Sequence, residues 1–279
     1  MRVALTISGL GRILGGDLDR VLELARAADA AGIHQLVLPD HVAIGPRLDR
    51  YPFADRFPYP PEEPWLEPMT TLAAIAGVTD RVRLATGVLI GPARPAVLLA
   101  KTAATLDVLS RGRLDLGLGT GWQREELAAV GVPYREREAR LDDTARACRA
   151  LWNDDPPVGF ASATVSFDAL WCEPRPVQPG SVPLWFGGGP TEATARRIAE
   201  LGVGWLPVGG TSADDVGRGI GMLREAFERA GRDPATLEVR ASGEPDLLEE
   251  LGVTVRSAAL GRAVATFDDA LGYVATLAR

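Results

Sequence analysis

One of the chain's two histidines stands where a short apolar segment, expected to be a strand, comes to its end. Pro39, Asp40 and His41 close the segment that spans residues 35–39. Imidazole titrates near neutral pH, so an Asp-His pair at a strand end suits proton transfer or a hydrogen bond to a cofactor ring. The alternative is that Asp40 caps the loop and His41 packs on it. His34 precedes the same strand and is expected to be structural.

Glycines follow two further predicted strands. Gly87 and Val88 come directly after the segment that ends at Thr86, and a glycine there allows a bulge against which a flat ligand can press. Relief of crowding at the end of the strand is the other explanation. The run from Gly117 to Trp122, which includes Thr120 and Gly121, lacks the third glycine of GxGxxG. It predicts a tight turn with Trp122 facing a binding site rather than a dinucleotide fingerprint.

A run of three glycines precedes a predicted helix. Gly187, Gly188 and Gly189 are followed by Pro190, which suits a first helical turn. Unpaired N–H groups and a partial positive charge at a helix N-terminus favour a phosphate, and glycines let the backbone amides converge on it. We therefore predict anion binding here, with a plain flexible turn as the alternative.

Composition excludes several classes of protein. The net charge of −7 argues against nucleic-acid binding, which requires a basic surface. No stretch is long and apolar enough for a membrane helix or a signal peptide. Cys148 and Cys172 stand in no CxxC or Cys/His cluster, and the motifs GxSxG, HExxH and Walker A are absent. We expect no metal site, no disulfide framework and a cytoplasmic location.

Short β-branched segments alternate with longer amphipathic ones along the chain. Strands are predicted at residues 3–7, 35–39, 82–86, 114–118, 182–186, 203–206, 237–241 and 253–255, and helices at 18–31, 68–78, 96–109, 137–152, 192–201, 213–230, 246–251 and 266–277. Eight strand-helix units favour a parallel sheet, because parallel neighbours need a crossover. We predict a single (β/α)8 TIM barrel over residues 1–279, with a long loop after the second strand and a hairpin or other excursion near 153–180. A doubly wound sheet is the competing fold.

Two adjoining segments resemble the luciferase-like monooxygenase family. The first is Ala85 to Arg113 (ATGVLIGPARPAVLLAKTAATLDVLSRGR), and the second is Leu116 to Glu126 (LGLGTGWQREE). Further matches are Ala28 to Gly32 before the Asp-His pair and Pro176 to Gln178 before the three glycines. Order and spacing hold from about residue 20 to 210, and beyond this range the likeness is one of architecture.

The resemblance implies a cofactor, a flavin or the deazaflavin coenzyme F420, in the mouth of the barrel. Members of the family transfer a hydride to or from that ring, or use reduced flavin with oxygen. By position, Asp40 and His41 would meet the ring edge, and Gly87-Val88 would form a bulge behind it, often with a non-prolyl cis peptide. Thr120 to Trp122 would form the turn beside it, and Gly187 to Gly189 would receive the phosphate.

One departure from the family concerns the substrate. Similar sugar-phosphate dehydrogenases carry a carboxylate where Trp122 stands and an aromatic residue where Gly45 stands. We therefore expect an apolar or aromatic small molecule rather than a phosphorylated sugar. Aromatic side chains of the long loop would contribute to its site, although about half of them would only pack the loop. They are Tyr51, Phe53, Phe57, Tyr59 and Trp65.

These observations predict an F420-dependent oxidoreductase in which His41 carries the coupled proton. Chain length, the single lysine and the Gly121-Trp122 turn resemble actinobacterial members of the family, which favours F420. The alternatives are a monooxygenase that uses reduced FMN and a flavin-binding protein without turnover. The resemblance also suggests a homodimer.

Overall fold

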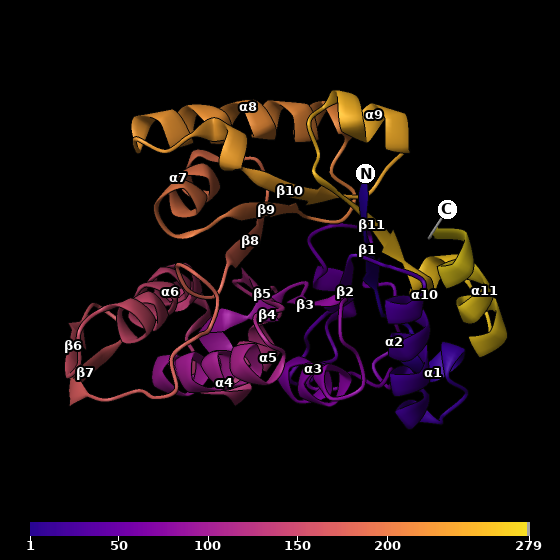
Figure 1. Ribbon diagram of the computed structural model, residues 1–279, viewed down its shortest axis with the longest axis horizontal. Helices are drawn as coiled ribbons and strands as arrows, with labels where there is room; N and C mark the ends of the chain where they lie inside the picture. The colour runs from indigo at the N-terminus through magenta and orange to yellow at the C-terminus, as the bar shows by residue number, and fades with distance from the viewer. Residues whose placement is uncertain (278–279) are drawn as a thin grey trace.

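Eight parallel strands close into a barrel in the computed structural model, which describes residues 1–277 (Figure 1). The strands are β1 (Arg2–Thr6), β2 (Gln35–Leu38), β3 (Arg83–Thr86), β5 (Leu114–Gly119), β8 (Leu184–Gly188), β9 (Gly204–Pro207), β10 (Glu238–Ala241) and β11 (Val255–Ala259). Each strand pairs with the next in this order, and β11 pairs with β1, for example Ala4 with Ser257. The predicted (β/α)8 barrel is confirmed, and the doubly wound alternative is wrong.

Helices surround the barrel and connect successive strands (Figure 1). The α-helices are α1 (Leu10–Ile13), α2 (Val21–Ala30), α3 (Pro68–Ala76), α4 (Ala96–Leu109), α5 (Arg124–Ala129), α6 (Arg137–Asn153), α7 (Glu192–Leu201), α8 (Ala213–Arg229), α9 (Pro245–Glu250), α10 (Leu260–Ala263) and α11 (Phe267–Leu277). Short 3₁₀ turns lie at Leu18–Arg20, Leu48–Arg50, Gly91–Ala93, Tyr134–Glu136 and Pro234–Thr236. The hydroxyls of Thr191 and Ser212 cap α7 and α8 by accepting backbone N–H bonds, which satisfies donors that a helix start leaves unpaired.

The excursion between α6 and β8 is an antiparallel hairpin, which was one of the two possibilities predicted for residues 153–180. Its strands are β6 (Val158–Ala161) and β7 (Ser166–Leu170), and the rings of Phe160 and Phe167 stack across them at 5.9 Å. The eighth barrel strand lies later than predicted, at Val255–Ala259 rather than 253–255. The stretch Arg256-Ser257-Ala258-Ala259 has no β-branched residue, so the sequence pattern stops at Val255 although the pairing with β1 continues.

Polar side chains fill part of the barrel interior. Arg83 forms a two-point ion pair with Asp115, with N–O distances of 2.7 Å, and the Gln35 amide donates to the same carboxylate at 2.6 Å. Arg240 donates to Gln35 Oε1 at 2.6 Å, which links β10 to β2 across the barrel. These bonds satisfy buried polar groups that would otherwise destabilise the core.

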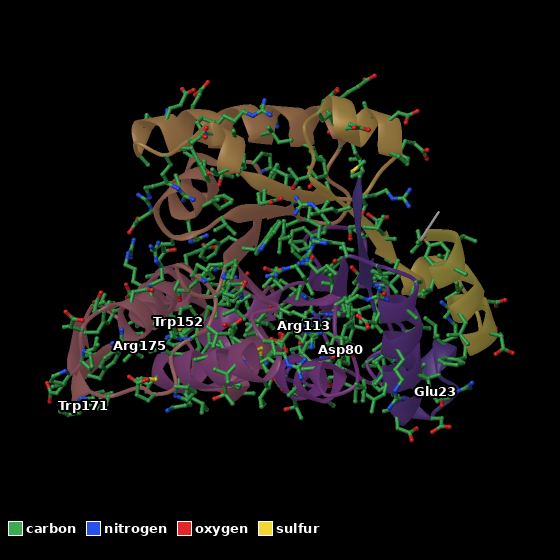
Figure 2. The ribbon with its side chains drawn as sticks, viewed as in Figure 1. Glu23, Asp80, Arg113, Trp152, Trp171 and Arg175 are labelled. Carbon is green, nitrogen blue, oxygen red and sulfur yellow. The ribbon has the colours of Figure 1, made fainter. Side chains whose placement is uncertain are left out.

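Apolar contacts hold the helices against the outside of the barrel. The Trp152 indole on α6 is 3% exposed and donates to the Ala100 carbonyl of α4 at 3.0 Å (Figure 2). Cys148 and Cys172 are buried and free. Among residues 1–277, no helix combines the length and apolar character needed to cross a bilayer, and no cluster of three potential metal ligands occurs.

Candidate active site at the barrel mouth

The predicted site residues lie at one end of the barrel. They follow β2, β3, β5 and β8, and because these strands run parallel, their C-terminal ends share the same rim. This end of a (β/α)8 barrel carries the active site in essentially every characterised enzyme with the fold. The structure thus brings the sequence-predicted residues together at the mouth.

His41 is held by a buried carboxylate that the sequence did not single out. Its Nδ1 lies 3.1 Å from Oε2 of Glu126, which is the third residue of α5. Oε1 of the same carboxylate accepts the backbone N–H groups of Val42 at 2.6 Å and Ala43 at 3.3 Å. An ionised carboxylate only accepts hydrogen bonds, so Nδ1 carries the proton and Nε2 is left as an acceptor. Among the described residues, none forms a hydrogen bond with Nε2.

Asp40 is engaged by its own partners at the end of β2. Its Oδ2 accepts hydrogen bonds from the Ile90 N–H at 2.8 Å and from Arg94 Nη1 at 2.6 Å. Its Oδ1 accepts a hydrogen bond from Arg94 Nη2 at 3.0 Å. Arg94 also bonds Glu67, the N-cap residue of α3, at 3.1 Å. Burial alone would lower the pKa of Arg94, but its bonds and ion pairs with Asp40 and Glu67 raise it. Asp40 thus joins β2 to the chain after β3, and the catalytic role predicted for it stays a prediction.

The peptide between Gly87 and Val88 is cis, as the family resemblance implied. Directly after it, the chain forms β4 (Leu89–Ile90), which pairs with the end of β5. The Val88 side chain lies above two glycines: a Cβ at Gly119 would lie 2.4 Å from Val88 Cγ2, and one at Gly187 would lie 2.9 Å from Cγ1. Glycines on β5 and β8 therefore make room for Val88 on the floor of the mouth.

The turn after β5 has the predicted form. Gly121 has φ of +74°, a backbone conformation that favours glycine, and a Cβ there would lie 2.9 Å from Ile90. Thr120 and Trp122 are half-buried on either side of it. A cavity of about 620 Å³ opens beside Trp122, and Arg124 and Tyr134 contribute to its lining.

The three glycines precede α7, as predicted, but Gly187 and Gly188 are the last two residues of β8 and only Gly189 lies beyond the strand. A Cβ at Gly188 would lie 2.9 Å from the Thr194 hydroxyl, whereas Gly189 faces open space. Gly188 is fixed by the Trp205 indole, which donates to its carbonyl at 2.9 Å. The backbone at Gly189 therefore has open space beside it, two residues before Thr191, the N-cap of α7. Binding of a phosphate at this position stays a prediction.

The long loop after β2 extends across the mouth. Tyr59 donates a hydrogen bond to Ser8 Oγ, after β1, at 2.9 Å. The Phe53 carbonyl lies 3.5 Å from the position that a Cβ of Gly210 would take, in the turn after β9. Because β2 and β9 lie on opposite sides of the eight-stranded barrel, a loop that contacts both exits passes over its opening.

Aromatic rings of this loop, together with Trp122 of the turn after β5, surround His41. The His41 ring lies 5.2 Å from Phe57, 4.9 Å from Trp65 and 6.1 Å from Trp122, each in an edge-to-face arrangement. Tyr51 extends the cluster through Phe57 and Trp122, both near 5 Å. Only 8% of the His41 side chain is exposed, so the imidazole is shielded from bulk water.

Two hydroxyl groups at the mouth were not predicted from the sequence. Thr6 at the end of β1 and Ser257 on β11 lie 3.4 Å apart, and both are half-buried. Neither belongs to a motif: Thr6 is the last residue of β1, and Ser257 is the third of the five residues of β11. They add hydrogen-bonding groups to the side of the mouth opposite β5.

Comparison with known proteins identifies the family of this chain. The sequence profile described as luciferase-like monooxygenase matches residues 3–246. The chain belongs to the luciferase-like monooxygenase family. It is therefore a luciferase-like oxidoreductase, a class whose structural neighbours include F420-dependent and FMN-containing enzymes.

Relatives with similar sequences occur in Mycobacterium tuberculosis. An uncharacterized protein is 34% identical over 263 residues, which are 91% of each chain. An F420-dependent hydroxymycolic acid dehydrogenase is 31% identical over 242 residues, 84% of this chain and 61% of that protein.

Solved structures share the fold. An F420-dependent secondary alcohol dehydrogenase, in complex with an F420–acetone adduct, has a TM-score of 0.70 and 20% identity and covers 98% of this chain and 82% of its own. The monooxygenase RslO1 from Streptomyces bottropensis has a TM-score of 0.71 and 24% identity. The match covers 100% of this chain and 79% of the RslO1 chain.

Proposed function

We propose that this protein is an F420-dependent oxidoreductase that oxidises an alcohol or reduces a ketone on a small, apolar or aromatic molecule. The observation that carries the proposal is the His41–Glu126 pair at the same mouth where Gly119 and Gly187 make room for Val88. Interconversion of an alcohol and a ketone moves a hydride from carbon and a proton from oxygen, so it needs both a hydride acceptor and a proton acceptor. The similarity to an F420-dependent dehydrogenase supports the choice of cofactor.

The residues at the mouth fit a planar ring with a phosphate-bearing tail. Gly119 and Gly187 lie where any larger side chain would displace Val88, and Gly189 faces open space before α7. In the proposal, Val88 supports the ring from below, Thr120, Gly121 and Trp122 flank it, and the amides from Gly187 to Gly189 receive the phosphate. When bound, F420 supplies a carbon that takes or gives the hydride.

His41 carries the proton in this scheme. Its Nε2 takes the hydroxyl proton of an alcohol as the C–H hydride leaves, and it returns the proton in the reverse direction. Glu126 is a positioning residue, because it fixes the tautomer and orientation of the imidazole through Nδ1. Asp40 positions the chain after Val88 through Ile90 and Arg94. The aromatic rings around His41 exclude water and offer an apolar surface to the substrate.

The proposed assembly is a homodimer formed through one exposed face, which we call the α4 face. It consists of Leu98, Leu109, Trp171 and Val177, each more than half exposed. The segment that carries Trp171 and Val177 runs along α4, because Val177 N–H bonds Asp107 at 2.8 Å. Figure 2 shows Trp171 at the periphery of the molecule, beside the hairpin. A large exposed apolar patch favours association with a second copy.

An anaerobic reaction of the protein with oxidised F420 and a panel of secondary alcohols tests the proposal. We expect loss of the oxidised-cofactor absorbance with apolar or aromatic alcohols, together with the matching ketone. Formation of an oxygenated product from the same compounds, with reduced FMN and oxygen and only when the protein is present, would instead establish the monooxygenase alternative. Tight binding of a flavin without either reaction would indicate a binding protein.

A further inference from the structure

A positively charged side chain lies inside the barrel directly beneath the mouth. Arg240, the third residue of β10, is 6% exposed and donates to Gln35 Oε1 at 2.6 Å and toward the Thr86 carbonyl at 3.5 Å. Its guanidinium lies over the Trp185 ring, 5.8 Å from the ring centre. The polar interior of the barrel thus extends up to the end of β3.

The charge of Arg240 has no carboxylate directly beside it. Among the described residues, no ion pair within 4.0 Å includes Arg240. The nearby carboxylate of Asp115 forms the two-point ion pair with Arg83. It is connected to Arg240 only through Gln35, which is hydrogen-bonded to both residues. Burial lowers the pKa of Arg240 to about 10, although Asp115 opposes the shift, so the side chain stays protonated at neutral pH. These three charged groups together leave one positive charge in excess.

This excess charge lies against the peptide that forms the floor of the mouth. A Cβ at Gly87 would lie 2.9 Å from Nη2 of Arg240, so the guanidinium touches the residue that begins the cis peptide. Val88, the next residue, faces Gly119 and Gly187 at the mouth. One residue of backbone therefore separates Arg240 from the place where the ring is proposed to lie. In a medium of low dielectric constant, a charge acts strongly over such a short distance.

We propose that Arg240 favours the reduced form of the ring cofactor at the mouth and so raises its reduction potential. This inference rests on the proposed function. A hydride brings two electrons and one proton, so the ring gains one negative charge when the alcohol loses its hydride and its hydroxyl proton leaves separately. A unit charge roughly 10 Å away, at an effective dielectric constant of about 20, changes such an equilibrium on the order of tenfold. For a two-electron couple, tenfold corresponds to about 30 mV.

The test compares the binding of oxidised and chemically reduced F420 under anaerobic conditions. The variants are Arg240→Met, which keeps the length and removes the charge, and Arg240→Lys, which keeps the charge. Arg232→Met is the matched control. Within the described part of the chain Arg232 also forms no ion pair, but it donates to the Gly202 carbonyl at 2.7 Å, before β9 at the opposite end of the barrel. The readout is the ratio of the two dissociation constants, which needs no turnover. Circular dichroism and thermal unfolding confirm that each variant is folded.

We expect Arg240→Met to lose about tenfold of the preference for reduced over oxidised F420, while the Arg240→Lys and Arg232→Met ratios stay within about twofold of wild type. An unchanged ratio in folded Arg240→Met would overturn this inference and leave the proposed function intact. If wild type binds neither form, the proposed function fails and this inference with it. Should Arg240→Met not fold, Arg240→Gln, which can still donate to Gln35, gives the same comparison.

Discussion

Replacing Glu126 with glutamine should move the imidazole proton of His41 from Nδ1 to Nε2 while leaving the local fold in place. Oε1 of Glu126 accepts the N–H groups of Val42 and Ala43, and the side-chain oxygen of glutamine can keep both bonds. The new amide nitrogen then occupies the position of Oε2, 3.1 Å from Nδ1 of His41. An amide nitrogen donates, so Nδ1 must become the acceptor and the proton must move to Nε2.

The magnitudes follow from that exchange of donor and acceptor. His41 loses its acceptor nitrogen at the mouth, so the general-base contribution to alcohol oxidation is removed, and turnover should fall by about 10²- to 10⁴-fold. Stability should fall by only about 1–2 kcal/mol, because two backbone bonds remain and one charge-assisted bond becomes neutral. Affinity for oxidised F420 should stay within about threefold, because Glu126 touches none of the glycines at the floor.

Steady-state oxidation of an alcohol substrate measures the effect, with cofactor affinity and thermal unfolding followed on the same samples. Glu125→Gln is the control: it makes the same chemical change on the same helix, but Glu125 is partly exposed and lies 3.5 Å from Arg50 rather than at His41. Wild-type turnover in Glu126→Gln, with the cofactor bound and the protein folded, would refute the role given to the pair.

Three further predictions concern the floor of the mouth, acid stability and assembly. Gly119→Ala should weaken F420 binding by about tenfold or more, because its Cβ would lie 2.4 Å from Val88, whereas Gly221→Ala on the open side of α8 should have no effect; fluorescence titration checks both. His34→Asn should reduce the loss of stability between about pH 7 and about pH 5, because burial lowers the pKa of His34 and the unfolded chain therefore binds a proton that the folded chain rejects. Denaturant midpoints that fall equally in both proteins would contradict this. Leu98→Glu should convert a dimer into monomers by light scattering, because it places a charge on the α4 face, and an unchanged mass would show that this face is free.

The sequence predicts the barrel because each apolar segment is followed by an amphipathic helix. It also predicts the position of Asp40 and His41, since both follow a strand directly and parallel strands end at one rim. The end of the last strand is predicted less well. Ser257 and Ala258 have no marked preference for a strand, and their conformation depends on pairing with β1.

The partners of the site residues were not predictable from local pattern. Glu126 stands in the charged run Arg124-Glu125-Glu126, which reads as the solvated face of a helix, yet it is 2% exposed. It is buried because it accepts bonds from the chain 83 to 85 residues earlier. Arg240 likewise contacts Gln35 across 205 residues of sequence. Such pairs arise only when the barrel closes, so no window of sequence contains both members.

Equilibrium titration with F420 and with FMN in parallel determines whether the mouth of the barrel binds a deazaflavin ring over Val88. Cofactor fluorescence and tryptophan quenching would follow binding, because Trp65 and Trp122 lie in the ring cluster around His41. We predict one saturable F420 site per chain, weaker binding of FMN, and loss of the F420 signal in Gly119→Ala. Tighter binding of FMN than of F420, or binding of neither cofactor by the wild-type protein, would contradict it.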